Sequence, residues 1–223
     1  MTHPQDITMQ TPLIIVDRNY LLREFCPADI PHIHAIASSE GFFFYNLDKT
    51  AETAKRLVHN AIATARAPLR TSFKLAIDAG ESHGGKCTFF NPPRHTEMHH
   101  KDGSQSWITR PPASSGNHCI GYVAFDGLDT EEPDIGYFIA PSHQGQGIAT
   151  NTMAALIKYV YNHHAAVDKV TLTVHPENIA SQRVADKLTF QPTGAHTTIQ
   201  TIRGEEPRIS FATNRERFFA HYG

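Results

Sequence analysis

The segment at residues 142–150, Ser-His-Gln-Gly-Gln-Gly-Ile-Ala-Thr, has residue types and spacing that suggest chemistry. Gly145 and Gly147 lie between a segment typical of a strand and one typical of a helix. Glycine lets the backbone approach a ligand closely, and the unpaired N–H groups at the start of a helix favour an anion such as a pyrophosphate. A tight strand-to-helix turn that binds nothing is at least as common for two glycines alone. Both interpretations stay open on these residues.

Two familiar phosphate-binding patterns do not match this loop. A P-loop requires a Lys directly after its last glycine, and Ile148 stands there. A dinucleotide-binding fingerprint requires a third glycine where Thr150 stands, and an acidic residue at the end of the next strand, whereas Asp168 precedes that strand. The sequence therefore disfavours both nucleotide-binding classes.

A third pattern matches at every position. The run Gln144–Ala149 resembles the Q/R-x-x-G-x-G/A motif of the GCN5-related N-acetyltransferases (GNAT), in which amides of the loop hold the pyrophosphate of acetyl-CoA. Asp134–Ile139 resembles the fourth strand of that family, whose bulge splays it from the fifth and opens a slot for the pantetheine arm. Residues 175–190 are similar to the N-x-x-S-x-x-V-x-x-K-x-G-F segment of the branch containing the ribosomal-protein N-terminal acetyltransferases.

The resemblance implies acetyl-CoA as cosubstrate and names the residues that bind it. These are Tyr137, Phe138, Ile139, Gln144, Gly145, Gln146, Gly147, Ile148, Ala149 and Asn178. Isolated aromatic residues such as Tyr137 and Phe138 are more often core residues. Asn178 is also a good helix N-cap, because it lies three residues before Ser181. Binding and structural roles are both open for these three residues.

The same resemblance suggests the catalytic residues. Transfer to a primary amine benefits from a base, and Asp134 stands where related enzymes often carry a Glu, with Glu132 as the reserve. Many family members protonate the leaving thiolate with a Tyr, but Ala185 stands at that position, so Ser181 becomes the candidate acid. The alternatives are a solvated acid for Asp134 and a backbone-bonded helix residue for Ser181. Thr189 also departs from the pattern, because it replaces the usual Gly before Phe190.

Alternating and helical periodicities predict the elements that must position these residues. An α+β fold follows, with a GNAT-like mixed, mostly antiparallel sheet, a splayed strand pair and flanking helices. The expected strands are Leu21–Phe25, Thr71–Asp78, a strand that begins at Ile120, Ile135–Ala140 and Val170–Val174. The expected helices are about Ile30–Ile36, Ala51–Arg66, a helix that begins at Gly147, and Asn178–Lys187. A closing hairpin is expected around Gly204.

We expect residues 1–223 to form a single acetyltransferase domain with a long loop insertion at about 79–118. This insertion contains six metal-capable side chains, but their spacing matches no standard zinc site, so no metal is expected; the six are His83, Cys87, His95, His99, His100 and His118. A surface loop is the simplest interpretation. Our hypothesis is that the insertion covers the acceptor groove and helps to select the substrate.

Composition restricts the class of protein. With 40% hydrophobic residues and a net charge of −2, the chain has a core-forming composition and no basic footprint for nucleic acid or a membrane surface. Three widely spaced cysteines and no apolar run long enough for a membrane span predict a cytoplasmic protein. A homodimer is compatible with the sequence.

Three functions from different classes remain open. The branch resemblance favours N-acetylation of a protein or peptide N-terminal amine. The same chemistry on a small amine, such as an amino acid, a polyamine or an antibiotic, is the first alternative. The second is a non-catalytic acyl-CoA-binding module, which Ala185 and Thr189 would suit.

Overall fold

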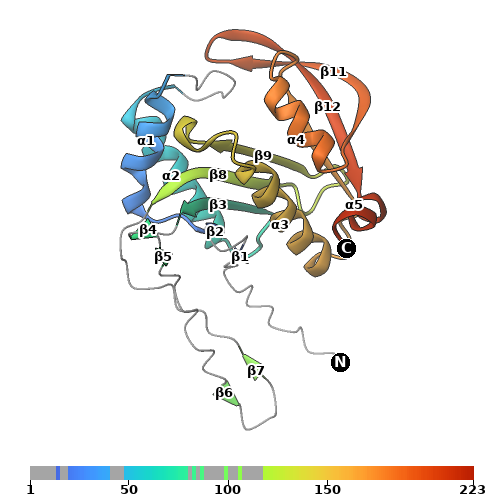
Figure 1. Cartoon of the computed structure of the whole chain (residues 1–223), viewed down its shortest axis with the longest axis horizontal. Helices are drawn as coiled ribbons and strands as arrows, with labels where there is room; N and C mark the ends of the chain where they lie inside the picture. The colour runs from blue at the N-terminus through green and yellow to red at the C-terminus, as the bar shows by residue number, and fades with distance from the viewer. Residues whose placement is uncertain are drawn as a thin grey trace.

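A computed structural model describes residues 14–15, 20–40, 48–79, 82–83, 86–87, 98–99, 105–106 and 118–223. Its main feature is a mixed eight-stranded sheet flanked by helices (Figure 1). In spatial order the strands are β1 (Ile14–Ile15), β2 (Tyr20–Glu24), β3 (Ser72–Ala79), β8 (Cys119–Asp126), β9 (Asp134–Ile139), β10 (Lys169–Val174), β12 (Gly204–Asn214) and β11 (Gln191–Thr201). Two separate two-residue pairs, β4 (Ser82–His83) with β5 (Lys86–Cys87) and β6 (Met98–His99) with β7 (Gln105–Ser106), belong to the segment between β3 and β8.

Within the described residues, five α-helices accompany the sheet: α1 (Ile30–Ser38), α2 (Ala51–Ala65), α3 (Ile148–His163), α4 (Ile179–Lys187) and α5 (Arg215–Tyr222). A short 3-10 turn, η1 (Pro27–Asp29), precedes α1, and another, η2 (Pro141–His143), precedes the loop before α3. The mixed α+β class predicted from the sequence is confirmed.

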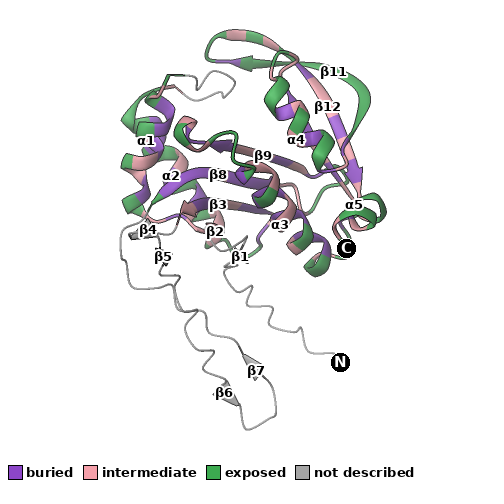
Figure 2. Ribbon diagram, in the orientation of Figure 1, coloured by how far each residue is buried: buried purple, intermediate pink, exposed green. Residues whose placement is uncertain are grey.

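Buried side chains form two clusters, one on each face of the sheet. Figure 2 colours the ribbon by burial, and the central strands β3 and β8 are largely in the buried colour. Alternation along β9 shows the division: Ile135 and Ile139 pack with residues of α3 and α4, whereas Phe138 packs with residues of α1 and α2. We call these the α3/α4 face and the α1/α2 face. Because both faces of the central strand β8 are covered, six of its eight residues are buried.

The strands β9 and β10 are parallel and share one register pair, Thr171 with Asp134. Each is held along its length on its other side, β9 by six antiparallel pairs with β8 and β10 by six with β12. The β8–β9 register runs without a shift, so the bulge implied by the family resemblance is absent from this pair. Beyond this pair the two strands share no register pair toward their carboxyl ends, which is where the family resemblance places the slot for the pantetheine arm.

Most predicted boundaries agree with the structure to within one or two residues. The terminal segment, for which the sequence analysis assigned no element, forms α5, capped by Asn214, whose Oδ1 accepts the Arg217 N–H at 2.9 Å. The insertion, in which no metal is expected, lies largely outside the described residues, so this expectation stays a prediction. Of its six candidate ligands, only the side chain of His118 is described.

Thr189 keeps the turn that the resemblance assigns to glycine. Its φ is 64°, and the N–H groups of Thr189 and Phe190 donate to the carbonyls of Asp186 and Ala185 at 3.1 and 3.0 Å. These two bonds are the Schellman pattern that ends many helices. A β-branched residue therefore holds a left-handed conformation here, and its hydroxyl lies 3.0 Å from that of Thr213.

Candidate active site

The glycine-rich loop begins α3. Gly147 is the N-cap of that helix with a φ of 78°, and Gly145 has a φ of 75°. A Cβ added at either glycine would have no atom within 4 Å, so the positive φ, and not crowding, is what favours glycine here. The first four N–H groups of a helix have no partner within the helix, so this turn presents donors and the positive end of the helix dipole.

Two glutamine side chains hold the loop in place. Gln144 donates through Nε2 to the carbonyl of Ile139 at 3.0 Å, which ties the loop to the end of β9. Gln146 donates through Nε2 to the carbonyl of Ser142 at 3.4 Å. The structure thus places the predicted cofactor residues Gln144, Gly145, Gln146, Gly147, Ile148 and Ala149 in one turn, although Ile148 is buried in the core.

Asp134 lies where β9 and β10 are still joined. Its Oδ1 is 3.4 Å from Thr171 Oγ1, which also lies 3.0 Å from the Pro133 carbonyl. One hydroxyl proton cannot serve both acceptors well, so the carboxylate receives little support. Burial is the main cause that raises the pKa of Asp134 to about 7, with a further contribution from Asp126, its cross-strand neighbour. The carboxyl group is therefore suited to exchange protons near neutral pH.

Glu132, the reserve base, has a different environment. It is exposed, and Lys169 Nζ donates to its Oε1 at 2.7 Å. This hydrogen bond lowers the pKa of Glu132. A carboxylate that is more acidic than usual is a weaker base, so Asp134 is the better placed of the two.

Ser181 lies in the first turn of α4. Asn178 Oδ1 accepts the Ser181 N–H at 3.1 Å, so the predicted N-cap role of Asn178 is present in the structure. The Ser181 hydroxyl lies 3.0 Å from the Tyr137 hydroxyl on β9. Ala185 is fully buried one turn further along α4.

Asp134 and Tyr137 are three residues apart on one strand, so their side chains point to opposite faces. Asp134 lies toward the α1/α2 face with Thr171, and Tyr137 packs against the cluster on the α3/α4 face. Phe138 is a core residue on the α1/α2 face, where its ring stacks on Tyr122 with centroids 5.2 Å apart. The Asp134 carboxyl group and the hydroxyl pair of Tyr137 and Ser181 thus lie on opposite faces of β9.

Residues 94–191 match the family model described as an acetyltransferase (GNAT) domain. This range contains the splayed strands, the glycine-rich turn and the first turn of α4. This part of the chain matches a GNAT acetyltransferase domain.

A curated relative agrees with this assignment. A probable N-acetyltransferase of Bacillus subtilis, YjcK, is 33% identical over 60 residues, which is 27% of this chain. The match spans 33% of that relative's own length.

Solved GNAT structures share the fold over nearly the whole chain. An acetyltransferase of the GNAT family from Bacillus anthracis has a TM-score of 0.63 at 16% identity, covering 92% of this chain and 99% of its own. RimL, a ribosomal L7/L12 alpha-N-protein acetyltransferase, has a TM-score of 0.62 at 14% identity, covering 95% and 98%. The aminoglycoside acetyltransferase AAC(6')-Ib, in complex with coenzyme A, has a TM-score of 0.59 at 15% identity, covering 92% and 99%.

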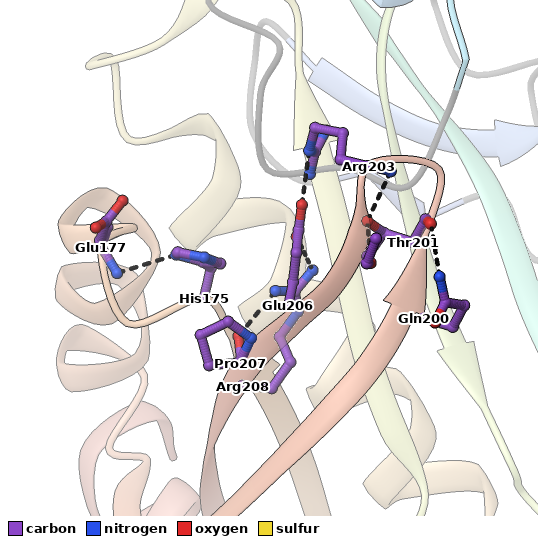
Figure 3. A network of polar contacts seen from close by, with 9 residues as sticks. His175, Glu177, Gln200, Thr201, Arg203, Glu206, Pro207 and Arg208 are labelled. Carbon is purple, nitrogen blue, oxygen red and sulfur yellow. Dashed lines mark hydrogen bonds and ion pairs between the residues drawn. The ribbon is translucent and has the colours of Figure 1, made fainter.

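The tip of the β11–β12 hairpin holds a polar network that the sequence patterns did not indicate (Figure 3). Glu206 accepts from Arg203 Nε at 2.6 Å and from an Arg208 terminal nitrogen at 3.1 Å. The Arg203 hydrogen bond is the main cause that lowers the pKa of Glu206 to about 2. The network fixes the hairpin end, and its members lie only two and three residues apart in the chain.

The described residues hold no cluster of three or more His, Cys, Asp or Glu side chains arranged to bind a metal ion. Among the same residues, no helix is long and apolar enough to cross a membrane.

Proposed function

We propose that this protein is an acetyl-CoA-dependent N-acetyltransferase whose acceptor is the N-terminal amine of a protein or peptide. The observation that carries this proposal is the position of the glycine turn: it follows the carboxyl end of β9, where β9 is no longer paired with β10. The donors of the turn and the slot between β9 and β10 share one end of the sheet, because Gln144 bonds the carbonyl of Ile139.

The residues present fit the proposed cosubstrate. Two glycines with positive φ start α3, and the space beside them where a side chain would project has no protein atom within 4 Å. Such a turn suits a pyrophosphate, because its N–H groups and the helix dipole both favour negative charge. The bound cosubstrate would supply an activated acetyl thioester. In the slot, the strand ends around Tyr137, Phe138 and Ile139 would position its arm.

Asp134 would accept the excess proton of the acceptor amine, directly or through water. An alkyl ammonium group has a pKa of about 10, so an ammonium group at neutral pH must lose a proton before its nitrogen can attack. A carboxyl group with a pKa of about 7 is a stronger base than an ordinary Asp and is still ionised in part at neutral pH. Because Asp134 lies on the α1/α2 face, we place the acceptor on that side.

Support for the peptide acceptor comes from the segment around Ser181 and from the likeness to RimL over 95% of this chain. A small amine is the second candidate, favoured by a likeness of similar extent to the aminoglycoside acetyltransferase. A panel of peptides, each free and Nα-blocked, beside aminoglycosides, polyamines and amino acids, distinguishes them. Turnover with free but not blocked peptides is the expected result.

The cosubstrate is tested first by thermal unfolding with acetyl-CoA, CoA and NAD in parallel. A ligand at about a hundred times its dissociation constant adds about 2.7 kcal/mol to the free energy of unfolding. We expect both CoA ligands to raise the Tm and NAD to leave it unchanged. No shift with any ligand would remove the basis of the proposal, whereas binding without turnover on any acceptor would indicate the non-catalytic module.

A further inference from the structure

A pair of hydroxyl groups connects β9 to α4 across the open part of the slot. The Tyr137 hydroxyl comes from β9 and the Ser181 hydroxyl from the first turn of α4, and their oxygens are 3.0 Å apart. Ser181 is 8% exposed, and the ring of Tyr137 packs against the cluster on the α3/α4 face. Neither side chain has room to move far, so the contact is a fixed part of the site.

Ser181 alone is a poor source of a proton. A serine hydroxyl can donate a hydrogen bond, but a free alkoxide is far more basic than a thiolate and would not persist. A tyrosine hydroxyl has an ordinary pKa of about 10, far below that of a serine hydroxyl, so it is the better proton donor of the two. Ala185, one turn beyond Ser181, has no proton to give. The pair can therefore do what the serine cannot do by itself.

The surroundings keep Tyr137 in its protonated form. Burial raises the pKa of Tyr137, and the hydrogen bond to Ser181 only partly opposes that effect. At neutral pH the side chain is thus a neutral phenol that can donate toward Ser181.

We propose that Tyr137 acts through Ser181 as the proton source for the departing sulfur of acetyl-CoA, a role that rests on the function proposed above. As the N–C bond forms and the C–S bond breaks, sulfur takes the Ser181 hydroxyl proton and Ser181 takes that of Tyr137. Solvent then reprotonates Tyr137. The amine nitrogen loses one proton before it attacks and another as the amide forms, and both leave through Asp134 to solvent. Tyr137 is a positioning and relay residue here, and Ser181 is the group that touches the reacting sulfur.

Tyr137→Phe tests the relay, because it removes the hydroxyl and keeps the ring. We expect kcat to fall by about 10- to 100-fold, as is typical when a proton donor is lost, with KM for acetyl-CoA unchanged. Ser181→Ala should lose a similar factor, and the double variant little more, because the two hydroxyls act as one unit. Tyr222→Phe is the matched control: it removes a phenol that donates to the Lys187 carbonyl at the other end of α4, at 2.9 Å, and should keep full kcat.

A binding measurement tests the same contact without turnover. At about pH 9 much of the CoA thiol is ionised, so a hydroxyl donor at the sulfur should favour CoA over desulfo-CoA. Calorimetry should show this preference falling by about 10-fold in Ser181→Ala, since a hydrogen bond to a charged group is lost, and by a smaller factor in Tyr137→Phe. Desulfo-CoA itself should bind all variants equally.

Different results would contradict the proton relay and the proposed acetyltransferase function. If the wild-type protein acetylates an amine and Tyr137→Phe keeps its kcat, or if the preference for CoA is unchanged in both variants, the relay is wrong and the acetyltransferase stands. If the wild-type protein neither binds CoA nor turns over, both are wrong. A kcat loss in Tyr137→Phe that adds fully to that of Ser181→Ala also overturns the relay.

Discussion

Asp134 and Thr171 form the register pair that joins β9 to β10, and Thr171 gives the carboxylate a weak hydrogen bond at 3.4 Å. The junction of the two strands thus places a poorly solvated acid at the start of the slot. A carboxyl group here is costly to ionise, and this cost is also what makes it a useful base.

We predict that Asp134→Asn lowers kcat/KM by about 100-fold, because the base is lost while the shape is kept. In the wild-type protein, kcat/KM should rise with pH through about 7, where Asp134 ionises. Steady-state rates from pH 5.5 to 9 measure both. Glu132→Gln is the control, since its exposed carboxylate pairs with Lys169 and its loss should leave the profile unchanged.

The same pKa makes a prediction about stability. Its folded-state pKa of about 7 lies above the ordinary 3.8, so between these values the folded state binds more protons than the unfolded state. The free energy of unfolding therefore falls as pH rises through this window, by the linkage relation. Asp134→Asn should be more stable than the wild-type protein above pH 7, and it should show no such gain below pH 4. Urea unfolding at the two pH values measures the difference. Equal differences at both pH values would contradict the raised pKa.

Gly147→Ala should weaken acetyl-CoA binding and reduce stability by about 1 kcal/mol, because alanine must adopt a φ of 78° at the helix start. Gly194→Ala offers a matched control. Gly194 has a φ of 77° and, like Gly147, no atom within 4 Å of an added Cβ, but it lies in β11. Both variants should lose similar stability, and only Gly147→Ala should lose affinity in calorimetry. Equal affinities would remove the turn from the binding site.

Asn178 can be tested for a role beyond its cap. Asn178→Ser keeps a capping oxygen and should retain stability, whereas Asn178→Ala should lose about 1 kcal/mol. If Asn178 also binds the cosubstrate, Asn178→Ser should lose affinity for acetyl-CoA despite its stable fold. Asn214→Ala removes the equivalent cap of α5 and should lower stability alone. An Asn178→Ser variant with full affinity would limit this residue to capping.

Thr189 should cost stability through its left-handed backbone. In a Thr213→Val background, where the hydroxyl contact of 3.0 Å is already gone, Thr189→Gly should raise the free energy of unfolding by about 1 kcal/mol. In the wild-type background the gain should be smaller, because Thr213 is 1% exposed and would lose its partner. Urea unfolding of the four proteins separates the two effects. No gain over Thr213→Val would show that the φ of 64° carries no strain.

The insertion can be removed at a point where its two ends meet. The Ala79 N–H donates to the His118 carbonyl at 3.0 Å, so an Asn-Gly turn in place of residues 80–117 should join β3 to β8. We expect this variant to fold and to bind acetyl-CoA. Our hypothesis that the insertion helps to choose the acceptor predicts altered KM values across the acceptor panel. Unchanged acceptor kinetics would end that hypothesis.

The sequence by itself determined the features that depend on local pattern. Periodicity placed the helices and most strands, and the spacing of Gln144, Gly147 and Asn178 indicated both the cofactor turn and the cap, because these motifs act within a few residues. The terminal helix was missed, because the apolar residues around Phe218 show only a weak helical periodicity. The helix forms where the chain packs against α3, as the contact between Phe218 and Tyr161 shows.

Tertiary structure decided what depends on residues that are distant in the chain. The raised pKa of Asp134 needs the burial at the β9–β10 junction and the charge of Asp126, and the pair of Tyr137 and Ser181 joins residues 44 positions apart. The absent bulge and the splay follow from how two strands are held by different partners. Local sequence patterns cannot predict such relationships, because burial, electrostatics and register are properties of the assembled sheet.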